Sequence, residues 1–353
     1  MYGILDRYIG KNILFSVLLI SVCLTIFTGI ITLIDKMRYI GRGDVDFLFV
    51  CEYVAYFIPG MFVTFFPVAI LIGGVIGLGF MARNSEITVM QSVGLSRLNI
   101  ALSSLKSLIP LIVIVMLISE YGVSPLERHA ENRLGYLSNG GSVAVTQSGV
   151  WLKEGSSIIG IANTLTDGSL SNIVRYDLED NVLKREIRAT KGIYENGAWV
   201  IHNVQTKEIL PERINTYFDK TQTWHLNLNS ERVEIIGNIN QNQTIKGLFD
   251  YISYLEDNHQ DASRFRLELY QKLLAPLSMI VMLLLALSTV FGPLRSINMG
   301  TRILAGIALG FGYYVLNQIV APFSLVYGIY PIIGASFGTV LFGALAVYLL
   351  GRH

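Results

Sequence analysis

GMFVTFFPVAILIGGVIGLGFMA, residues Gly60 to Ala82, contains no charged side chain and a single hydroxyl group among its apolar and glycine residues. A helix of about 20 such residues crosses the ~30 Å hydrocarbon core of a bilayer. Five further runs have a similar length and apolar character: Ile13 to Ile34, Leu98 to Ile118, Leu269 to Phe291, Ile303 to Ala321 and Pro331 to Leu350. The sequence therefore predicts six transmembrane helices.

The overall composition agrees with a membrane protein. Apolar residues make up 52% of the chain and charged residues only 15%, and the mean hydropathy is +0.50, values far from those of soluble domains of this length. The formal net charge of +1 gives no basic surface of the kind that nucleic-acid binding requires. We therefore expect no nucleic-acid partner.

Sequence motifs that carry chemistry are missing. The chain contains no GxxxxGK[ST], HExxH or CxxC motif, and its two cysteines, Cys23 and Cys51, lie in or beside apolar runs. Gly73, Gly74 and Gly77 lie inside a predicted span, where small residues allow helices to pack closely. We predict no catalytic residue, no metal site and no cofactor in this chain, and hence no enzymatic activity of its own.

Basic residues in the short loops predict the orientation, because cytoplasmic loops are enriched in Lys and Arg. Basic residues occur before the first span, between spans two and three, and between spans four and five: Arg7, Lys11, Arg83, Arg97, Arg295 and Arg302. The loop between residues 321 and 331, by contrast, has no basic residue. Both termini are expected in the cytoplasm. The long insertion between spans three and four is then on the outer side of the membrane.

That insertion, roughly Ser124 to Gln243, is polar and predicts β-structure. Stretches such as SNIVRYDL and KGIYENGAWVIHNV alternate partly between apolar and polar residues, with turn dipeptides at Asp180-Asn181 and Asn196-Gly197. A sandwich or jelly-roll fits the number of such stretches. After it, Leu248, Ile252 and Leu255 share one face of a predicted amphipathic helix.

The predicted organisation has three parts. Residues 1–123 hold transmembrane helices one to three, residues 124–245 form an external β domain, a sandwich or jelly-roll, and residues 246–353 hold the connecting helix and transmembrane helices four to six. The fold class is thus a mixed membrane protein with a three-plus-three arrangement of helices around an inserted β domain.

A short polar stretch, ARNSEITVMQSVGLSR (Ala82 to Arg97), separates spans two and three. Ser85 is a favourable N-cap and Gly94 a favourable helix end, so a helix over about residues 85–93 is predicted. Ile87 and Met90 form a small apolar stripe beside Glu86. From the residues alone, this segment is either a docking helix for a cytoplasmic partner or a simple connecting turn.

Several stretches resemble the lipopolysaccharide-export permeases, the LptF/LptG family, over essentially the whole chain. They are LDRYIGKNIL near the N-terminus, SEITVMQSVGLSR, SPLERHAEN, ALSTVFGPLRSINMGTRI and YYVLNQIVAPFSLVYGIYPIIGA. The LDRY start, Leu5 to Tyr8, and the stretch from Phe291 to Gly300 are most similar to the LptG branch of this family.

The resemblance implies a permease subunit of an ABC-type exporter in the inner membrane of a Gram-negative bacterium. Such a subunit extracts lipopolysaccharide from the outer leaflet and passes it to a periplasmic bridge. The implied partners are the paralogous permease LptF, a dimer of the cytoplasmic ATPase LptB, which binds ATP and Mg, and the membrane-anchored periplasmic LptC. A different class of function stays open: an ATPase-coupled mechanotransmission or signalling protein that carries no substrate.

The resemblance also suggests roles for particular residues. Lipopolysaccharide carries phosphates, so Lys36, Arg38 and Arg42 in the first external loop are expected to contact it; alternatively, Asp35, Asp44 and Asp46 simply neutralise them. Arg128 and Arg133 are further candidates for the phosphate site. Tyr313 and Asn317 either line the substrate cavity or stabilise helix packing. Glu86, Ile87 and Met90 are the expected contacts with the ATPase.

Overall fold

The computed structural model describes residues 3–138, 150–154, 156–164, 169–179, 182–195, 197–210, 213–224, 244–258, 260–291 and 298–351. The chain divides into two compact units. A helical unit comprises Met1–Asp35, Val54–Pro125 and Ala262–His353, and a second unit comprises Lys36–Tyr53 and Leu126–Asp261.

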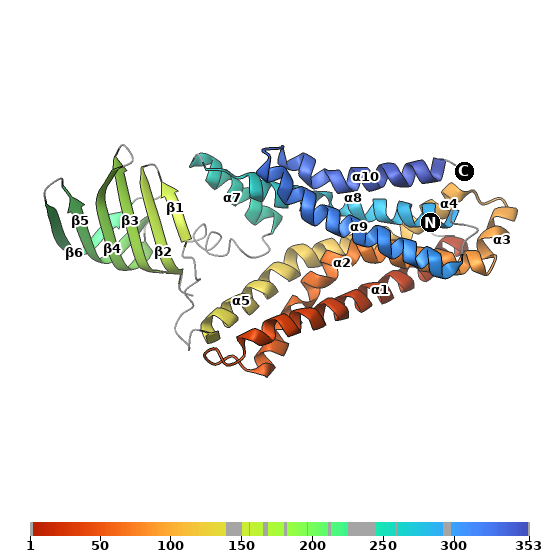
Figure 1. Ribbon diagram of the computed structural model, residues 1–353, viewed down its shortest axis with the longest axis horizontal. Helices are drawn as coiled ribbons and strands as arrows, with labels where there is room; N and C mark the ends of the chain where they lie inside the picture. The colour runs from red at the N-terminus through yellow and green to blue at the C-terminus, as the bar shows by residue number, and fades with distance from the viewer. Residues whose placement is uncertain are drawn as a thin grey trace. The chain divides into compact units, whose positions relative to one another are not determined.

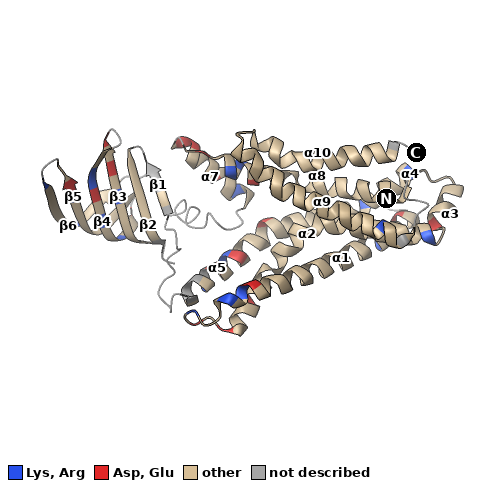
Figure 2. Cartoon of the chain, viewed as in Figure 1, with Lys and Arg blue, Asp and Glu red and all other residues tan. Residues whose placement is uncertain are grey.

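Long helices confirm all six predicted spans (Figure 1). They are α1 (Ile4–Lys36), α2 (Phe47–Arg83), α4 (Arg97–Leu117), α8 (Ser263–Phe291), α9 (Met299–Val326) and α10 (Pro331–Gly351). Among the described residues, six stretches are long and apolar enough to cross a membrane. Figure 2 shows that charged residues lie mainly towards the ends of these helices. The start of α1 and the end of α10 lie at the same end of the bundle as α3 (Glu86–Ser92).

Helix α2 is longer than predicted. The predicted span, Gly60 to Ala82, covers only the second part of α2, which starts at Phe47 and runs without interruption through both Pro59 and Pro67. The helix continues through these positions because a proline removes only one backbone hydrogen bond, and apolar surroundings favour the helix that satisfies all the others.

Glycines allow α2 to pack closely against its neighbours, as predicted. A Cβ atom at Gly73 would lie 2.6 Å from Val17 Cα in α1, and one at Gly74 would lie 2.8 Å from the Ala286 side chain in α8. Helix α8 is buried all round near its end, where Leu285 to Leu287 are fully inaccessible. The core of the helical unit therefore forms around α8, between α1, α2, α4 and α10.

Helices α1 and α9 differ from the others because they are poorly covered by their own chain. Within the most apolar window of each span, 22% of the residues are buried in α1 and 17% in α9, compared with 61% in both α2 and α8. Outward-facing apolar residues follow each other along both helices: Val22, Ile26, Phe27 and Ile30 in α1, and Leu304, Ile307, Phe311 and Ile319 in α9. These two helices thus offer large unpartnered apolar faces.

The inserted segment begins with helix rather than strand. A π-helical turn, Ile118–Val123, follows α4 and leads into α5 (Ser124–Ser138). Ala130 and Leu134 are four residues apart and both buried, which is the spacing of a helix face. The sequence prediction placed this part in the β domain because its charged residues hide that short apolar stripe.

Six strands then form one antiparallel sheet in the order β1-β2-β3-β4-β5-β6. Their bounds are β1 (Val150–Glu154), β2 (Ser157–Thr164), β3 (Leu170–Glu179), β4 (Val182–Glu195), β5 (Ala198–Ile209) and β6 (Ile214–Trp224). The inserted β domain is confirmed. Within the described ranges, however, each strand pairs with the next along the chain, so these six strands show an up-and-down order instead of the crossovers of a jelly-roll. Short connections favour this order because they join neighbouring antiparallel strands.

Polar residues interrupt the regular pairing across the sheet. Asn172 in β3 and Asn203 in β5 have positive φ values of 51° and 53°, and the Asn203 amide donates to Thr190 Oγ1 in β4 at 3.1 Å. The alternation of inward and outward side chains shifts by one residue at this line, so Val204 and Ile201 both point inward. Trp199 in β5 and Ile173 in β3 are likewise almost completely buried.

Helix α7 (Ile245–Asp257) follows the sheet and confirms the predicted amphipathic helix. Its N-cap residue, Thr244, accepts a hydrogen bond from the Gly247 backbone N–H at 3.1 Å. Leu248, Ile252 and Leu255 are buried as predicted. The same burial raises the pKa of Tyr251 to about 12.

Candidate functional site

The polar stretch between spans two and three forms α3, a helix of seven residues. Its end matches the prediction: Gly94 has a φ of 98°, and the backbone N–H groups of Gly94 and Leu95 donate to Gln91 and Met90, as in a Schellman motif. The start of α3 differs from the prediction, because Ser85 has a φ of 61° and its side chain makes no capping hydrogen bond. Ser85 therefore turns the chain out of α2 instead of capping α3.

The apolar stripe of α3 faces inward. Ile87 and Met90 are only 5% and 8% exposed and belong to the core of the helical unit. Their side chains are therefore not available to fill a groove on another protein. This differs from the sequence prediction, in which Ile87 and Met90 contact a partner. The outward apolar residues are Val89 and Val93, which are 59% and 77% exposed.

Glu86 is held by the first turns of α1. The Tyr8 hydroxyl donates to Glu86 Oε2 at 3.0 Å, and the Asn84 amide lies 3.4 Å from Oε1. Sequence reasoning overlooked Tyr8, which is 78 positions away from Glu86. The contact joins α3 directly to α1, although α3 is covalently connected only to α2 and α4.

A second contact fixes the same end of α1. Ser103 in α4 donates to the Asp6 carboxylate, which also accepts from the Gly3 backbone N–H at 3.1 Å. Gly10 lies so close to α4 that an added Cβ would be 2.1 Å from Ser107 Oγ. The beginning of α1 is therefore tied to both α3 and α4.

At the other end of α1, the predicted basic residues gather around an aromatic ring. Lys36 ends α1, Arg38 and Tyr39 lie in the 3-10 turn η1 (Met37–Tyr39), and Arg42 follows in the loop. The Lys36 Nζ atom is 5.5 Å from the centroid of the Tyr39 ring, and the guanidinium carbons of Arg38 and Arg42 are each 5.2 Å from it. The structure thus brings all three predicted cations together; we call Lys36, Arg38, Tyr39 and Arg42 the basic-aromatic cluster.

Neighbouring residues extend this arrangement. The Lys36 ammonium also lies 4.8 Å from the centroid of the Tyr53 ring, and the Tyr53 hydroxyl donates to Glu131 in α5. Asp46, which the sequence offered as a neutralising partner, accepts from the Phe49 backbone N–H at 2.8 Å and so caps α2. The sequence analysis did not predict the aromatic partners, Tyr39 and Tyr53. Tyr39 is nevertheless close to all three cations along the chain, since Lys36 precedes it by three positions, Arg38 precedes it by one and Arg42 follows it by three.

The two further basic candidates, Arg133 and Arg128, differ in their contacts. Arg133 forms an ion pair with Glu52, and its guanidinium lies 5.5 Å from the Phe49 ring centroid. The Nε atom of Arg128 is buried and makes no hydrogen bond within the described part of the chain. Of the two, Arg133 is the more accessible, since its side chain is 44% exposed.

Tyr313 and Asn317 in α9 pack against α10. Tyr313 is buried and meets the Phe342 ring edge-on, with centroids 5.4 Å apart. A Cβ at Gly338 would lie 2.3 Å from Asn317 Oδ1, so this amide fills the space beside that glycine. Of the two roles left open by the sequence, these contacts favour helix packing.

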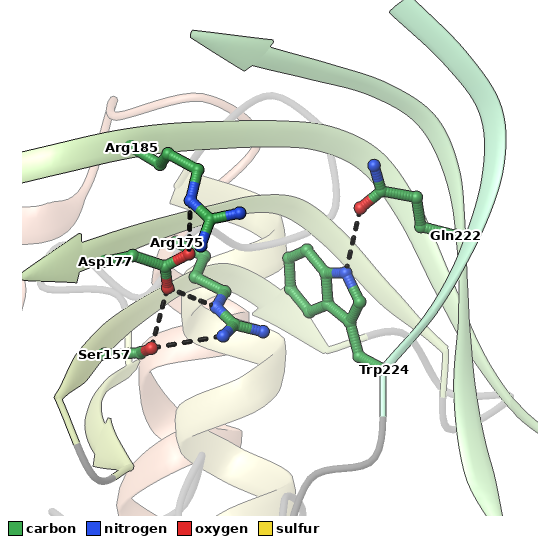
Figure 3. Close-up of polar contacts among 6 residues, drawn as sticks. All are labelled: Ser157, Arg175, Asp177, Arg185, Gln222 and Trp224. Carbon is green, nitrogen blue, oxygen red and sulfur yellow. Dashed lines mark hydrogen bonds and ion pairs between the residues drawn. The ribbon is translucent and has the colours of Figure 1, made fainter. Parts of the chain in front are cut away.

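The sheet contains a separate polar cluster (Figure 3). Asp177 in β3 accepts from Ser157 in β2 and from Arg175, both at 2.7 Å, and Arg185 in β4 lies 3.6 Å away. The Arg175 guanidinium in turn lies 5.3 Å from the Trp224 ring centroid in β6. These contacts join four strands and match a structural role, because each charged group has a partner.

No group of three or more His, Cys, Asp or Glu side chains that could hold a metal ion occurs among the residues that the structure describes. Residues 292–297, which include Arg295 and most of the Phe291 to Gly300 stretch, lie outside the described part of the chain.

Six apolar helices, an inserted antiparallel sheet and a short helix between spans two and three define a multi-pass membrane protein with a β domain. The family model for the lipopolysaccharide export system permease LptF/LptG matches residues 7–352. The chain belongs to this family, and is thus a multi-pass protein of the inner membrane.

Relatives support the LptG branch. The lipopolysaccharide export system permease protein LptG of Escherichia coli K12 is 37% identical over 355 residues, which cover 99% of this chain and 99% of the relative. The protein of the same name from Haemophilus influenzae strain Rd is 35% identical over 356 residues, which cover 100% and 99% of the two chains.

Proposed function

We propose that this chain is the LptG-type permease subunit of a lipopolysaccharide exporter. The observation that carries the proposal is the relationship to LptG proteins over essentially the full length of both chains. The six apolar helices and the inserted sheet agree with it. In this role the chain has no catalytic residue of its own, and it moves lipopolysaccharide from the outer leaflet of the inner membrane towards a periplasmic acceptor.

The proposed orientation has both termini and α3 in the cytoplasm and the sheet in the periplasm. It is supported by the basic loops, and by the shared position of α3 and the two ends of the chain at one end of the helical unit. The basic-aromatic cluster is at the opposite end of α1 from Tyr8. It would therefore lie at the height of lipid headgroups on the periplasmic side, where the phosphates of lipopolysaccharide are found.

The proposed partners supply what this chain lacks. The exposed apolar faces of α1 and α9 fit a second permease, LptF, with the substrate cavity between the two subunits. Helix α3 fits an ATPase dimer, LptB, which would bind ATP and magnesium. Glu86 and the outward residues Val89 and Val93 are the proposed contacts with that ATPase. LptC would receive the substrate in the periplasm.

The phosphate site is proposed at Lys36, Arg38 and Arg42. Their charges lie close to one another, and partial removal from water at the headgroup level strengthens pairing with a phosphate. Arg133 is a weaker candidate because Glu52 already pairs with it. Ile87 and Met90 retain only a structural role, as they are buried in the chain's own core.

Reconstitution tests the proposal. The chain is purified with LptF, LptB and LptC from its own organism and inserted into vesicles that contain lipopolysaccharide. ATP should then drive lipopolysaccharide onto a soluble periplasmic acceptor, and omission of this chain should abolish the transfer. A complete complex that hydrolyses ATP but releases no lipopolysaccharide would instead favour a mechanotransmission protein.

A further inference from the structure

The basic-aromatic cluster places three positive charges around one neutral ring. Lys36, Arg38 and Arg42 each lie between 5.2 and 5.5 Å from the Tyr39 centroid. The separation of any two of these charges is therefore at most the sum of their distances from the Tyr39 centroid. This upper limit, about 11 Å, is only slightly longer than the Debye length of about 8 Å at physiological salt, so part of their mutual repulsion remains unscreened.

A ring of this kind offsets part of that repulsion. The face of a tyrosine ring attracts a cation by about 0.5–1 kcal/mol at an exposed site. Without the ring, long flexible side chains such as Lys and Arg would separate, because separation lowers the repulsion and restores rotamer freedom. Tyr39 thus favours the arrangement in which the three cations stay together.

The backbone of the loop is folded to permit this arrangement. Gly41 and Gly43 have positive φ values of 83° and 57°. The Arg42 backbone N–H donates to the Tyr39 carbonyl at 3.0 Å, and the Gly41 N–H donates to the Val45 carbonyl at 3.1 Å. This tight turn brings Arg42 back towards the ring that Lys36 and Arg38 approach from the preceding helical turns.

We propose that Tyr39 is a positioning residue that gathers Lys36, Arg38 and Arg42 into a single anion-binding group for the phosphates of lipopolysaccharide. The inference rests on the proposed function and adds a residue that is itself neutral and has no charge to offer a phosphate. Its role is to keep the positive charge concentrated before the substrate arrives, so that binding requires less ordering of side chains.

Substitutions at Tyr39 that distinguish the contribution of the ring face from that of the hydroxyl group test this inference. In the complete complex with LptF, LptB and LptC, Tyr39→Phe keeps the ring face and Tyr39→Leu removes it. Lipopolysaccharide binding is measured by titration of a fluorescent lipopolysaccharide into the complex in nanodiscs at low and high NaCl. Tyr39→Phe should bind within about twofold of the wild type, and Tyr39→Leu should lose about fivefold or more at low salt. Tyr39→Trp should bind at least as tightly as the wild type, since Trp attracts cations best.

Matched controls separate this inference from the proposed function. Tyr121→Leu removes another exposed tyrosine, outside the cluster, and should leave binding unchanged. The triple variant Lys36→Gln, Arg38→Gln, Arg42→Gln removes the charges themselves. If the triple variant binds normally, the proposed phosphate site is wrong. If it binds weakly while Tyr39→Leu binds normally, only the role of Tyr39 is overturned.

Two further outcomes are informative. Equal losses in Tyr39→Phe and Tyr39→Leu would assign the effect to the hydroxyl and overturn the inference. If Tyr39→Leu fails to assemble with its partners, the comparison of Tyr39→Trp and Tyr39→Phe with the wild type decides, because a fivefold loss in either of these ring-preserving variants contradicts a role for the ring face.

Discussion

Two tyrosines contact charged side chains at opposite ends of α1: Tyr39 lies beside Lys36, and Tyr8 donates a hydrogen bond to Glu86. Lys36, Arg38 and Arg42 were predicted because three cations in an external loop are unusual in this chain. Tyr39 and Tyr8 were not predicted, because the first depends on a tight turn and the second on a contact across 78 positions. Charge is visible in a sequence, whereas the partner of that charge depends on the fold.

Charge reversal tests the residue-scale proposal most directly. Lys36→Glu together with Arg38→Glu should weaken lipopolysaccharide binding by at least tenfold, because two attractive phosphate contacts become repulsive. Assembly with the ATPase should stay intact, since α3 and Tyr8 are unchanged. Photo-cross-linking of lipopolysaccharide to the complex measures the effect, and the conservative pair Lys36→Arg, Arg38→Lys serves as the control. Equal cross-linking of the reversed variant and the wild type would remove both residues from the site.

Glu186 in β4 predicts a pH-dependent stability of the sheet. Arg188 donates to Glu186 at 2.8 Å, and this hydrogen bond holds the pKa of the Glu186 carboxyl below its usual value. A carboxyl whose pKa is lower in the folded state stabilises that state above the ordinary glutamate pKa of about 4.3, and this contribution is lost as the pH falls through the folded-state pKa.

Replacing Glu186 with Gln should therefore speed hydrogen exchange of the β4 and β5 amides by about fivefold at pH 7.5, which corresponds to about 1 kcal/mol. At pH 3.5 the difference from the wild type should become smaller. Glu195→Gln, at an exposed position at the end of β4, is the matched control and should have little effect at either pH. If the difference in exchange rate between Glu186→Gln and the wild type is the same at both pH values, the Glu186 carboxylate is not the source of the pH-dependent stability.

Elements were predicted better than their faces. The helix at α3 was expected over about residues 85–93 and occupies Glu86–Ser92, because a glycine with positive φ ends it. The sequence prediction placed Ile87 and Met90 against a partner, but both are buried in the chain's own core. The prediction failed because such an apolar stripe can pack equally well against the same chain or against another protein. Periodicity defines a stripe but does not identify what covers it.

Glu86→Lys is the test for α3. The lysine removes the acceptor for Tyr8 and places a positive charge at the start of the helix, which the helix dipole disfavours. We expect weaker assembly with LptB, or an assembled complex whose ATP hydrolysis no longer drives export. A compensating acidic substitution on the ATPase should restore part of the activity.

Glu86→Gln is the matched control, because the amide oxygen still accepts from Tyr8 while the charge is lost. It should assemble better than Glu86→Lys. Normal assembly, hydrolysis and export by Glu86→Lys would show that α3 is only a connecting turn.

The contact between α1 and α2 also permits an element-scale prediction. Gly73→Ala would place a methyl group 2.6 Å from the Val17 backbone, and such overpacking costs about 1–3 kcal/mol. The variant should lower the melting temperature of the purified complex by several degrees. Gly300→Ala, whose added methyl group meets no atom within 4 Å, should not; an equal effect of both substitutions would mean that the close approach is not responsible.

At the scale of the whole molecule, hydropathy predicted six spans because the membrane leaves few alternatives to a helix. The presence of strands was also predictable, from turn dipeptides and partial alternation. The strand order was not, because a jelly-roll and an up-and-down sheet use similar strands and differ in long-range pairing. The positive φ values of Asn172 and Asn203 were not predictable either, because neither residue type requires them.

The unpartnered faces of α1 and α9 lead to the last prediction, which concerns the assembled permease. These helices are the least buried of the six spans, and we propose that each faces LptF across an opening that must widen for lipopolysaccharide to enter. Cys23 is exposed in α1 and is first replaced by serine. Cysteines at Phe27 in α1 and Phe311 in α9 are then paired with cysteines on the facing helices of LptF.

Oxidation should form these cross-links and stop export, and reduction should restore it, because a covalent bond holds the opening closed. A cysteine at Val347, exposed in α10, is the matched control and should not cross-link to the same LptF positions. The measurements are the fraction of cross-linked protein and the ATP-driven transfer of lipopolysaccharide in vesicles. Complete cross-linking with undiminished transfer would mean that lipopolysaccharide enters elsewhere, and that the exposed faces of α1 and α9 only hold the two permeases together.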